Sequence, residues 1–267
     1  MNVTDVLILG GLLCSPPLVA LAQTEDPHDA QPERPTVATH AGTVAPGWLE
    51  VEAGGESDRY DDHSHGAVVP VTIKLGLASN VQWSVFASAV QVPGSTSFEP
   101  GDFSLGIKWR IADELPVLGR FALLPTIKFP TGSTATGAGT GTTDGTILLI
   151  SSNDLKVMAL DINLAYTRRT GDGTQAPRNA TLWTASLGGP GIGDLGWTVE
   201  LYGYPGTSGP AGRPPVVAAL FGPTLTFKSW LVFDAGLVEP VAGPQPHAVY
   251  LGAVWNIGYL GHENGAE

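Results

Sequence analysis

Cysteine, charge and long apolar runs are scarce in this sequence. Its 267 residues include one cysteine, and 14% are charged, against about a quarter in an ordinary soluble domain. With 13 Lys and Arg against 25 Asp and Glu, the chain lacks the basic stripe that a nucleic-acid partner requires. No run of about 18 apolar residues follows the N-terminal region, which excludes a helical membrane protein. The 35 glycines and the 43% hydrophobic share leave an all-β protein or a turn-rich secreted protein.

The N-terminus has the pattern of an export signal. Residues 6–22 (VLILGGLLCSPPLVALA) form an apolar stretch that ends in small residues, so we predict a signal peptide over residues 1–22. Asp5 stands where a basic residue is usual, and a buried N-terminal strand or helix is the alternative. Cleavage after Ala22 would remove Cys14, and the mature protein would then have neither disulfides nor thiolate chemistry.

From Trp48 onward, apolar residues recur at every second position. The clearest case is the segment 102–111, in which apolar Phe103, Leu105, Ile107, Trp109 and Ile111 alternate with small or polar Asp102, Ser104, Gly106, Lys108 and Arg110. Successive side chains of a strand point to opposite faces, so this segment has one apolar and one polar face. The alternation predicts strands near 48–56, 67–77, 80–90, 102–112, 120–129, 145–151, 155–167, 180–187, 194–204, 216–227, 230–237 and 247–259.

The connections between these strands alternate in length. Long connections, rich in Gly, Pro, Ser, Thr or Asp, cover 57–66, 91–101, 130–144, 168–179, 205–215 and 238–246, and the connections between them are mostly short. Outer-membrane barrels have this asymmetry, whereas a soluble β-sandwich has no reason to sort its loops. We therefore predict an all-β fold, a transmembrane antiparallel up-and-down β-barrel of about 12 strands, over residues 47–260.

Two segments flank the predicted barrel. Residues 23–46 are polar, acidic and without period, which predicts an extended periplasmic leader or a plug. The loop 130–144 is a second candidate for a plug, and residues 261–267 form a C-terminal tail.

Charged residues within the strands fall on the face opposite the apolar one. Because Lys or Arg facing lipid at the midplane costs roughly 2–4 kcal/mol, these side chains are expected to point into the lumen. The candidate lumen-lining residues for solute contact are Glu50, Glu52, Lys74, Asp102, Lys108, Arg110, Lys128 and Glu200. The strand 155–167 fits this separation of charged and apolar faces poorly, because Asp161 and Asn163 share a face with Val157 and Ala159. Its lipid-facing residues are expected to be those of the other face, Leu160, Ile162, Leu164 and Tyr166.

Three stretches of the sequence resemble a known family. The stretch Val44-Ala-Pro-Gly-Trp-Leu-Glu-Val-Glu-Ala-Gly54, the strand Gly101-Asp-Phe-Ser-Leu-Gly-Ile-Lys-Trp-Arg110 and the following Leu124–Ser133 are similar to the outer-membrane proteins grouped as the MetA-pathway of phenol degradation family. The resemblance runs from about residue 33 to the C-terminus. It implies a transporter-like outer-membrane barrel whose link to the breakdown of aromatic compounds rests on genetic context.

Motifs for chemistry are weak. Asp61, Asp62, His63 and His65 are the best metal candidate, but a hydrated outer loop is the favoured interpretation. The serine elbow G-x-S-x-G of hydrolases does not occur, and the Thr/Gly tract 131–145 lacks the Gly-Lys-Ser/Thr end of a phosphate loop. We therefore predict no catalytic residue, no metal and no cofactor.

These observations predict a passive channel or transporter in the cell outer membrane. It would carry small solutes, aromatic or hydrophobic ones among them, in uptake or efflux. The expected partners are outer-membrane lipid, the solute and the barrel-assembly machinery, with no nucleic acid. Two alternatives stay open: an outer-membrane lipid hydrolase, for which His247 at a strand start is the candidate base, and a secreted β-sandwich binding module.

Overall fold

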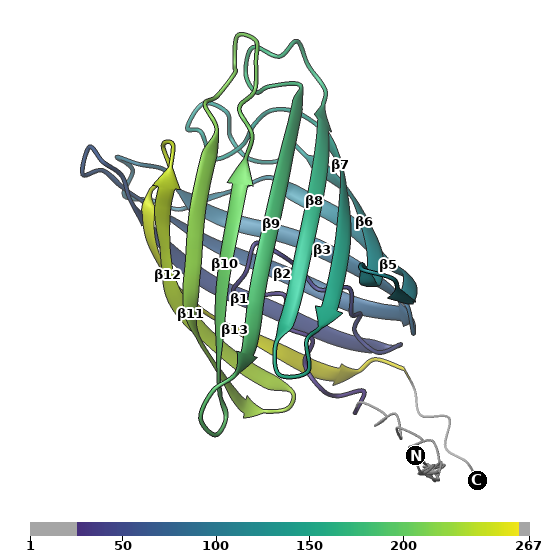
Figure 1. The fold of residues 1–267 in the computed structure, drawn as a ribbon. Helices are drawn as coiled ribbons and strands as arrows, with labels where there is room; N and C mark the ends of the chain where they lie inside the picture. The colour runs from purple at the N-terminus through teal and green to yellow at the C-terminus, as the bar shows by residue number, and fades with distance from the viewer. Residues whose placement is uncertain (1–25, 262–267) are drawn as a thin grey trace, which may run out of the picture.

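The computed structural model describes residues 26–261, and within this range the chain is an all-β barrel (Figure 1). The predicted signal peptide, residues 1–22, and residues 262–267 of the predicted tail lie outside the described residues. Between residues 26 and 261, no helix has the length and apolar character needed to cross a bilayer.

Twelve long strands and one two-residue strand make up the sheet. Their bounds are β1 Trp48–Arg59, β2 His65–Ala78, β3 Val81–Gln91, β4 Glu99–Pro100, β5 Phe103–Leu115, β6 Gly119–Phe129, β7 Asp144–Asp154, β8 Ala159–Arg169, β9 Asn179–Pro190, β10 Leu195–Tyr204, β11 Val216–Lys228, β12 Leu231–Ala242 and β13 His247–Tyr259. The short β4 pairs with Ala89 and Val90 at the end of β3. The alternation of apolar and polar residues in the sequence did not predict this strand.

The sheet closes on itself. Every strand is antiparallel to its neighbours, and β1 pairs with both β2 and β13, from Trp48 opposite Tyr259 to Arg59 opposite His247. A closed ring leaves no unpaired strand edge, which is the condition for crossing a membrane with strands. The predicted barrel of about 12 strands is thus confirmed, and the alternative of a β-sandwich is wrong.

The two faces of each strand have opposite chemical character. On β5, Ile107 and Trp109 are 47% and 49% exposed, whereas Lys108 between them is fully buried. On β8, Ile162, Leu164 and Tyr166 are exposed and Asn163 is buried, as predicted for the poorly fitting strand. The apolar face therefore points outward and the polar face points into the barrel, the reverse of a soluble domain.

The strand ends differ from the predictions in two ways. The predicted strand 155–167 begins only at Ala159, because Leu155–Met158 form the turn before it, with Lys156 at a positive φ of 76°. The strand β1 continues to Arg59 and β12 to Ala242, through residues predicted to be loop. Both ends continue the ladder of backbone hydrogen bonds through residues that do not alternate in hydropathy, Ser57–Arg59 on β1 and Val238–Ala242 on β12, so periodicity in hydropathy does not show them.

The connections sort to the two ends of the barrel, as Figure 1 shows. The short-turn end carries the turns after β2, β5, β7, β9 and β11, together with the start of β1 and the end of β13. The long-loop end carries the other connections, the longest being residues 130–143 between β6 and β7. In an outer membrane the short turns face the periplasm.

Candidate functional site

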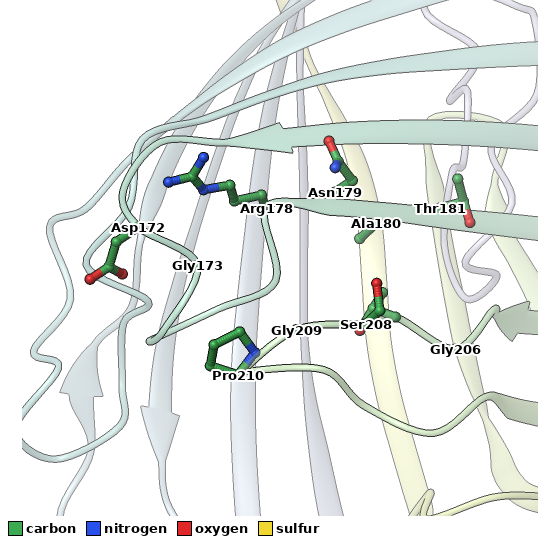
Figure 2. Close-up of a pocket in the computed structure, with 11 residues that line it drawn as sticks. Asp172, Gly173, Arg178, Asn179, Ala180, Thr181, Gly206, Ser208, Gly209 and Pro210 are labelled. Carbon is green, nitrogen blue, oxygen red and sulfur yellow. The ribbon is translucent and has the colours of Figure 1, made fainter.

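A hollow of about 360 Å³ opens at the long-loop end, which we call the mouth hollow (Figure 2). It lies between the loops 170–178 and 205–215, with Arg178, Asn179 and Thr181 on one side and Ser208 and Pro210 on the other. Polar side chains with both donors and acceptors line it, so a small polar molecule finds partners there.

One acid of the mouth hollow is already engaged. Asp172 accepts hydrogen bonds from the backbone N–H of Thr174 at 2.9 Å and from its hydroxyl at 2.6 Å. These bonds lower the pKa of the Asp172 carboxyl below its ordinary value. The carboxylate therefore shapes the loop, and Arg178 remains the cation of this hollow.

A larger hollow of about 620 Å³ opens at the short-turn end, which we call the base hollow. Its walls come from the turns after β7 and β9 and from residues that precede β1, with Gln31, His40, Arg120, Asp161 and Met158 among them. The two hollows lie at opposite ends of the barrel. The residues inside the barrel therefore determine whether a solute can pass from one hollow to the other.

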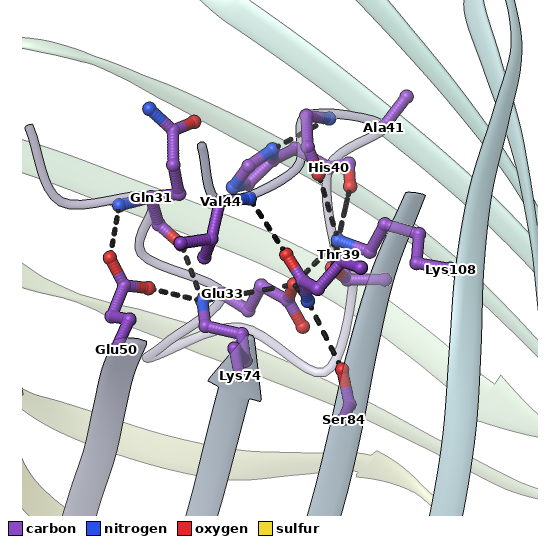
Figure 3. A network of polar contacts seen from close by, with 12 residues as sticks. Gln31, Glu33, Thr39, His40, Ala41, Val44, Glu50, Lys74, Ser84 and Lys108 are labelled. Atoms are coloured by element: carbon purple, nitrogen blue, oxygen red, sulfur yellow. Dashed lines mark hydrogen bonds and ion pairs between the residues drawn. The ribbon is translucent and has the colours of Figure 1, made fainter. Parts of the chain in front are cut away.

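Residues 26–46, which we call the inner segment, lie inside the barrel (Figure 3). The segment is anchored at the short-turn end. Ala30 N–H donates to Ser229 O, Asn256 Nδ2 donates to Pro27 O, and the His28 ring stacks on Trp230 at 5.7 Å between centroids.

Inward-facing side chains accept the backbone N–H groups of the inner segment. The Glu50 carboxylate accepts the N–H of Gln31, and the Glu52 carboxylate accepts the N–H of Glu33. The Glu200 carboxylate accepts from both Val37 and Ala38. All four bonds are 2.7–2.8 Å long. The remaining acceptors are Asn163 for Thr39, Ser152 for Ala41 and Gln82 for Val44. These side chains satisfy backbone donors that a strand would satisfy with a neighbouring strand.

The contacts of the inner segment follow the strands around the barrel. Beyond Glu33 they pass from Asp234 on β12 to Glu200 on β10, Asn163 on β8, Ser152 on β7 and Gln82 on β3. The segment thus makes one circuit of the inner wall before it joins β1. A segment held at so many strands narrows the lumen over its full circumference.

Two buried lysines complete this network. Lys74 Nζ lies 2.5 Å from both Glu50 Oε1 and Glu52 Oε1 and donates to Gln31 O at 2.6 Å. Lys108 Nζ lies 2.5 Å from Glu33 Oε1 and donates to carbonyls of His40 and Gly42 (Figure 3). A buried charge persists only where partners replace its hydration, and the inner segment supplies several of them.

The electrostatics of the inner segment depend on these lysines. Burial raises the pKa of the Glu33 carboxyl, but the ammonium groups of Lys108 and Lys74 outweigh this and hold the pKa below its ordinary value. Burial and the charge of Lys108 lower the pKa of His40 to about 3. Its Nδ1 accepts the Gly42 N–H at 3.0 Å, which requires an unprotonated nitrogen.

The eight candidate lumen-lining residues divide into three groups. Five of them, Glu50, Glu52, Lys74, Lys108 and Glu200, are at most 4% exposed and contact the inner segment. Asp102 and Lys128 form an ion pair at 2.6 Å at the long-loop end, and Arg110 pairs with Asp113 near the short-turn end. The structure therefore does not bring the eight together, and solute contact by them stays a prediction.

The loop 130–143, the other candidate plug, is held at the rim of the barrel. Asp102 accepts the backbone N–H groups of Gly132 and Thr140 at 3.0 Å, and Thr136 donates to Glu99. Lys128 also reaches Asp144, which pairs with Arg169. These contacts tie the loop to the ends of neighbouring strands.

Sequence reasoning missed several members of the network. Gln82, Ser152 and Asn163 contact the inner segment and were not among the candidates, because only charged residues were considered. Amide and hydroxyl residues at inward positions of alternating strands are the signal that identifies them. Asp234 on β12 also belongs to the network and pairs with Arg34 at 3.1 Å.

No site for a metal ion emerges within residues 26–261. In this range no three His, Cys, Asp or Glu side chains are grouped closely enough to hold a metal ion. In the candidate cluster of the loop after β1, Asp62 accepts both the N–H and the hydroxyl of Ser64.

Comparison with known proteins shows the fold. No protein-family profile and no curated protein matches the chain. A COG4313 outer membrane channel from Pseudomonas putida F1 is similar, with a TM-score of 0.62 and 10% identity over 80% of this chain and 97% of that chain. The NanC porin has a TM-score of 0.54 at 11% identity, covering 78% and 100%. The KdgM porin, solved with disordered oligogalacturonate, has a TM-score of 0.52 at 8% identity, covering 78% and 99%.

The chain thus shares the barrel fold of outer-membrane channels and porins. The family named from the sequence motifs is not among these matches and stays a prediction.

Proposed function

We propose that this protein is an outer-membrane channel for the passive uptake or efflux of small amphipathic or aromatic solutes, with the inner segment as its constriction. The observation that carries the proposal is the reversal of the two faces, with Ile107 and Trp109 outside and Lys108 fully buried inside. An apolar exterior around a polar interior suits a barrel that separates lipid from a solute path. Hollows at both ends of the barrel supply the two mouths of that path.

The character of the inner wall supports an amphipathic solute. Tyr202, Leu220, Val238 and Tyr250 form an apolar cluster on β10–β13. Within the described residues, the hydroxyls of Thr184 and Tyr250 are buried without a hydrogen-bond partner. A small molecule with an apolar ring and a polar group matches this combination. A link to the breakdown of aromatic compounds remains part of the proposal.

The channel proposal includes no enzymatic activity. Ser57 and His247 line one hollow on the outer wall, and His247 contacts Glu239 at 2.6 Å. No hydrogen bond joins Ser57 to His247 in the described part of the chain. The serine therefore lacks the contact with a base that a nucleophile uses.

Deletion of residues 26–46 tests the proposal. The full chain and the deletion variant would be reconstituted in planar bilayers, and conductance and the flux of small aromatic acids would be measured. We expect low conductance for the full chain and a severalfold increase for the variant, because the inner segment narrows the lumen. Equal conductance of both proteins would contradict the constriction, and no conductance or flux by either would contradict the channel.

A matched control separates the two candidate plugs. Deletion of Thr134–Gly137 shortens the loop 130–143 and leaves the inner segment in place. We expect this variant to conduct like the full chain, since the contacts of the loop lie at the rim. A severalfold increase from this variant alone would assign the constriction to the loop.

A further inference from the structure

Three basic side chains lie at one level on the outer wall, at the long-loop end. In the strand register Arg59 on β1 is opposite His65 on β2 and opposite His247 on β13. They face outward with the apolar belt, since Val249 and Leu251, two and four residues beyond His247, are 55% and 68% exposed. The basic cluster therefore lies where the apolar belt ends.

This cluster surrounds a hollow of about 330 Å³, which we call the head hollow. The ion pairs of the described arginines involve Arg34, Arg110 and Arg169, so the Arg59 guanidinium has no carboxylate partner there. His247 Nδ1 lies 2.6 Å from Glu239 Oε2. Because a carboxylate only accepts, Nδ1 carries the hydrogen, and Nε2 is left for a ligand.

A second hollow of about 310 Å³ continues from the first along β1, and we call it the chain hollow. The two share Ser57 and Val249. Its walls are mainly apolar, with Val69 on β2, Leu251 on β13 and Phe98 from the loop before β4. At Gly55 no heavy atom lies within 4 Å of the position that a Cβ would take, so the floor is open.

We propose that the head and chain hollows together bind one lipid of the outer leaflet through a phosphorylated headgroup. The inference rests on the proposed function, because that function places the barrel in an outer membrane with this end outward. The fork of the Arg59 guanidinium matches two phosphate oxygens and the imidazole of His65 adds a donor, whereas His247, whose Nδ1–H is donated to Glu239, accepts at Nε2 from a protonated oxygen of the headgroup. An acyl chain lies along β1, over Gly55 and between the side chains of β2 and β13.

Native mass spectrometry of the full chain in detergent tests this site. The probes are dioleoyl phosphatidic acid, dioleoylglycerol and inorganic phosphate. We expect one phosphatidic acid to be retained per chain, with neither dioleoylglycerol nor inorganic phosphate retained, because both the charge and the chains are needed. Equal retention of dioleoylglycerol would overturn the headgroup contact, and full competition by inorganic phosphate would reduce the site to a free-anion site.

Substitutions place the lipid on this wall. Arg59→Gln is expected to lower retention of phosphatidic acid about tenfold, the effect of losing a charge-assisted hydrogen bond. Gly55→Leu is expected to lower it comparably by filling the chain hollow while the basic cluster stays intact. The matched control is Arg168→Gln, an exposed arginine at the same end on β8 that contacts Asn179.

Three results would contradict the lipid site. Equal loss from Arg59→Gln and Arg168→Gln would indicate general attraction to the rim, and full retention in Arg59→Gln would exclude the head hollow. Release of oleic acid from bound lipid would replace binding with hydrolysis at Ser57. Since these readouts do not use the lumen, lipid retention without conductance would contradict the channel and leave the lipid site standing.

Discussion

The inner wall of the barrel differs between its two ends. Toward the short-turn end, polar and charged side chains are buried because the inner segment covers them, as at Glu50, Lys74 and Lys108. Toward the long-loop end of β10–β13, Tyr202, Leu220 and Tyr250 are buried because they pack against one another. The polar region is buried only when the inner segment covers it, whereas the apolar region is buried by contacts among its own strands.

This difference teaches where the barrel can change without unfolding. Removal of the inner segment leaves unpaired charges that water can hydrate, since the ring of strands stays closed. Removal of an apolar contact on β10–β13 leaves a gap that nothing fills. We therefore expect conductance to respond to the first region and stability to the second.

The largest effect of a single substitution is expected at Lys108. Lys108→Met leaves the Glu33 carboxylate buried without its partner at 2.5 Å, at a cost of about 3 kcal/mol for the docked segment. Hydrogen exchange of the backbone amides of Val37 and Ala38 measures the docking, and we expect their protection to fall by about two orders of magnitude.

Two further variants test whether the Lys108–Glu33 ion pair is the cause of this loss of protection. Glu33→Gln combined with Lys108→Met is expected to recover part of the protection, because both charges are gone. Lys228→Met removes an exposed lysine at the end of β11 and is expected to change nothing. Unchanged exchange in Lys108→Met would show that the ion pair does not hold the segment.

A smaller, graded effect is expected from acid. The docked state keeps the pKa of His40 at about 3, below its ordinary value of 6.5, so the released segment binds a proton that the docked segment does not. Through His40, docking therefore weakens as the pH falls below 6.5, by at most about tenfold per unit. The lowered pKa of Glu33 acts in the same direction below 4.5. Conductance and amide exchange between pH 7 and 4 measure this.

Substitutions of His40 and Glu33 separate the contributions of these two side chains to the acid response. His40→Gln is expected to flatten the response between pH 6.5 and 4.5, since glutamine can still accept the Gly42 N–H without titrating. Glu33→Gln is expected to remove the additional response below 4.5. A full response in His40→Gln would assign the acid sensitivity to other groups.

The smallest effect is expected in the apolar region. Tyr250→Phe removes a hydroxyl that has no partner in the described residues, so the free energy of unfolding should change by less than about 0.5 kcal/mol. Thermal denaturation and amide exchange should match the parent, whereas the flux of small aromatic acids should shift about twofold if this hydroxyl meets the solute. A clear loss of segment protection would show that the two regions are coupled.

Much of the barrel follows from residues close together in the sequence. The alternation over 102–111 assigns Ile107 and Trp109 to the outside and Lys108 to the inside, because strand geometry alone decides the face. It fails at Leu155–Met158, where apolar residues occupy a turn, and at Ser57–Arg59, where a strand continues through polar residues. Local hydropathy does not contain the hydrogen-bond ladder that decides these ends.

The candidate site was harder to predict. The inner segment has no period, and its partners lie far away in the sequence: Ala38 contacts Glu200, 162 residues on. Composition therefore left a leader and a plug equally open. The charged candidates Glu50 and Lys74 were correctly placed on the inner face, but a list of inward charges does not reveal that a backbone segment covers them.

The inner segment enters and leaves the barrel at the same end. Its start is fixed by Ala30 at the turn after β11, and its end leads into β1 at Trp48, so the chain forms a loop that never threads the ring. It can therefore withdraw through the short-turn end while still attached to β1. Attachment keeps it at a high effective concentration near its binding groups, so recapture is intramolecular and independent of protein concentration. In such a channel the inner segment would be a constriction that leaves the lumen and returns to it reversibly.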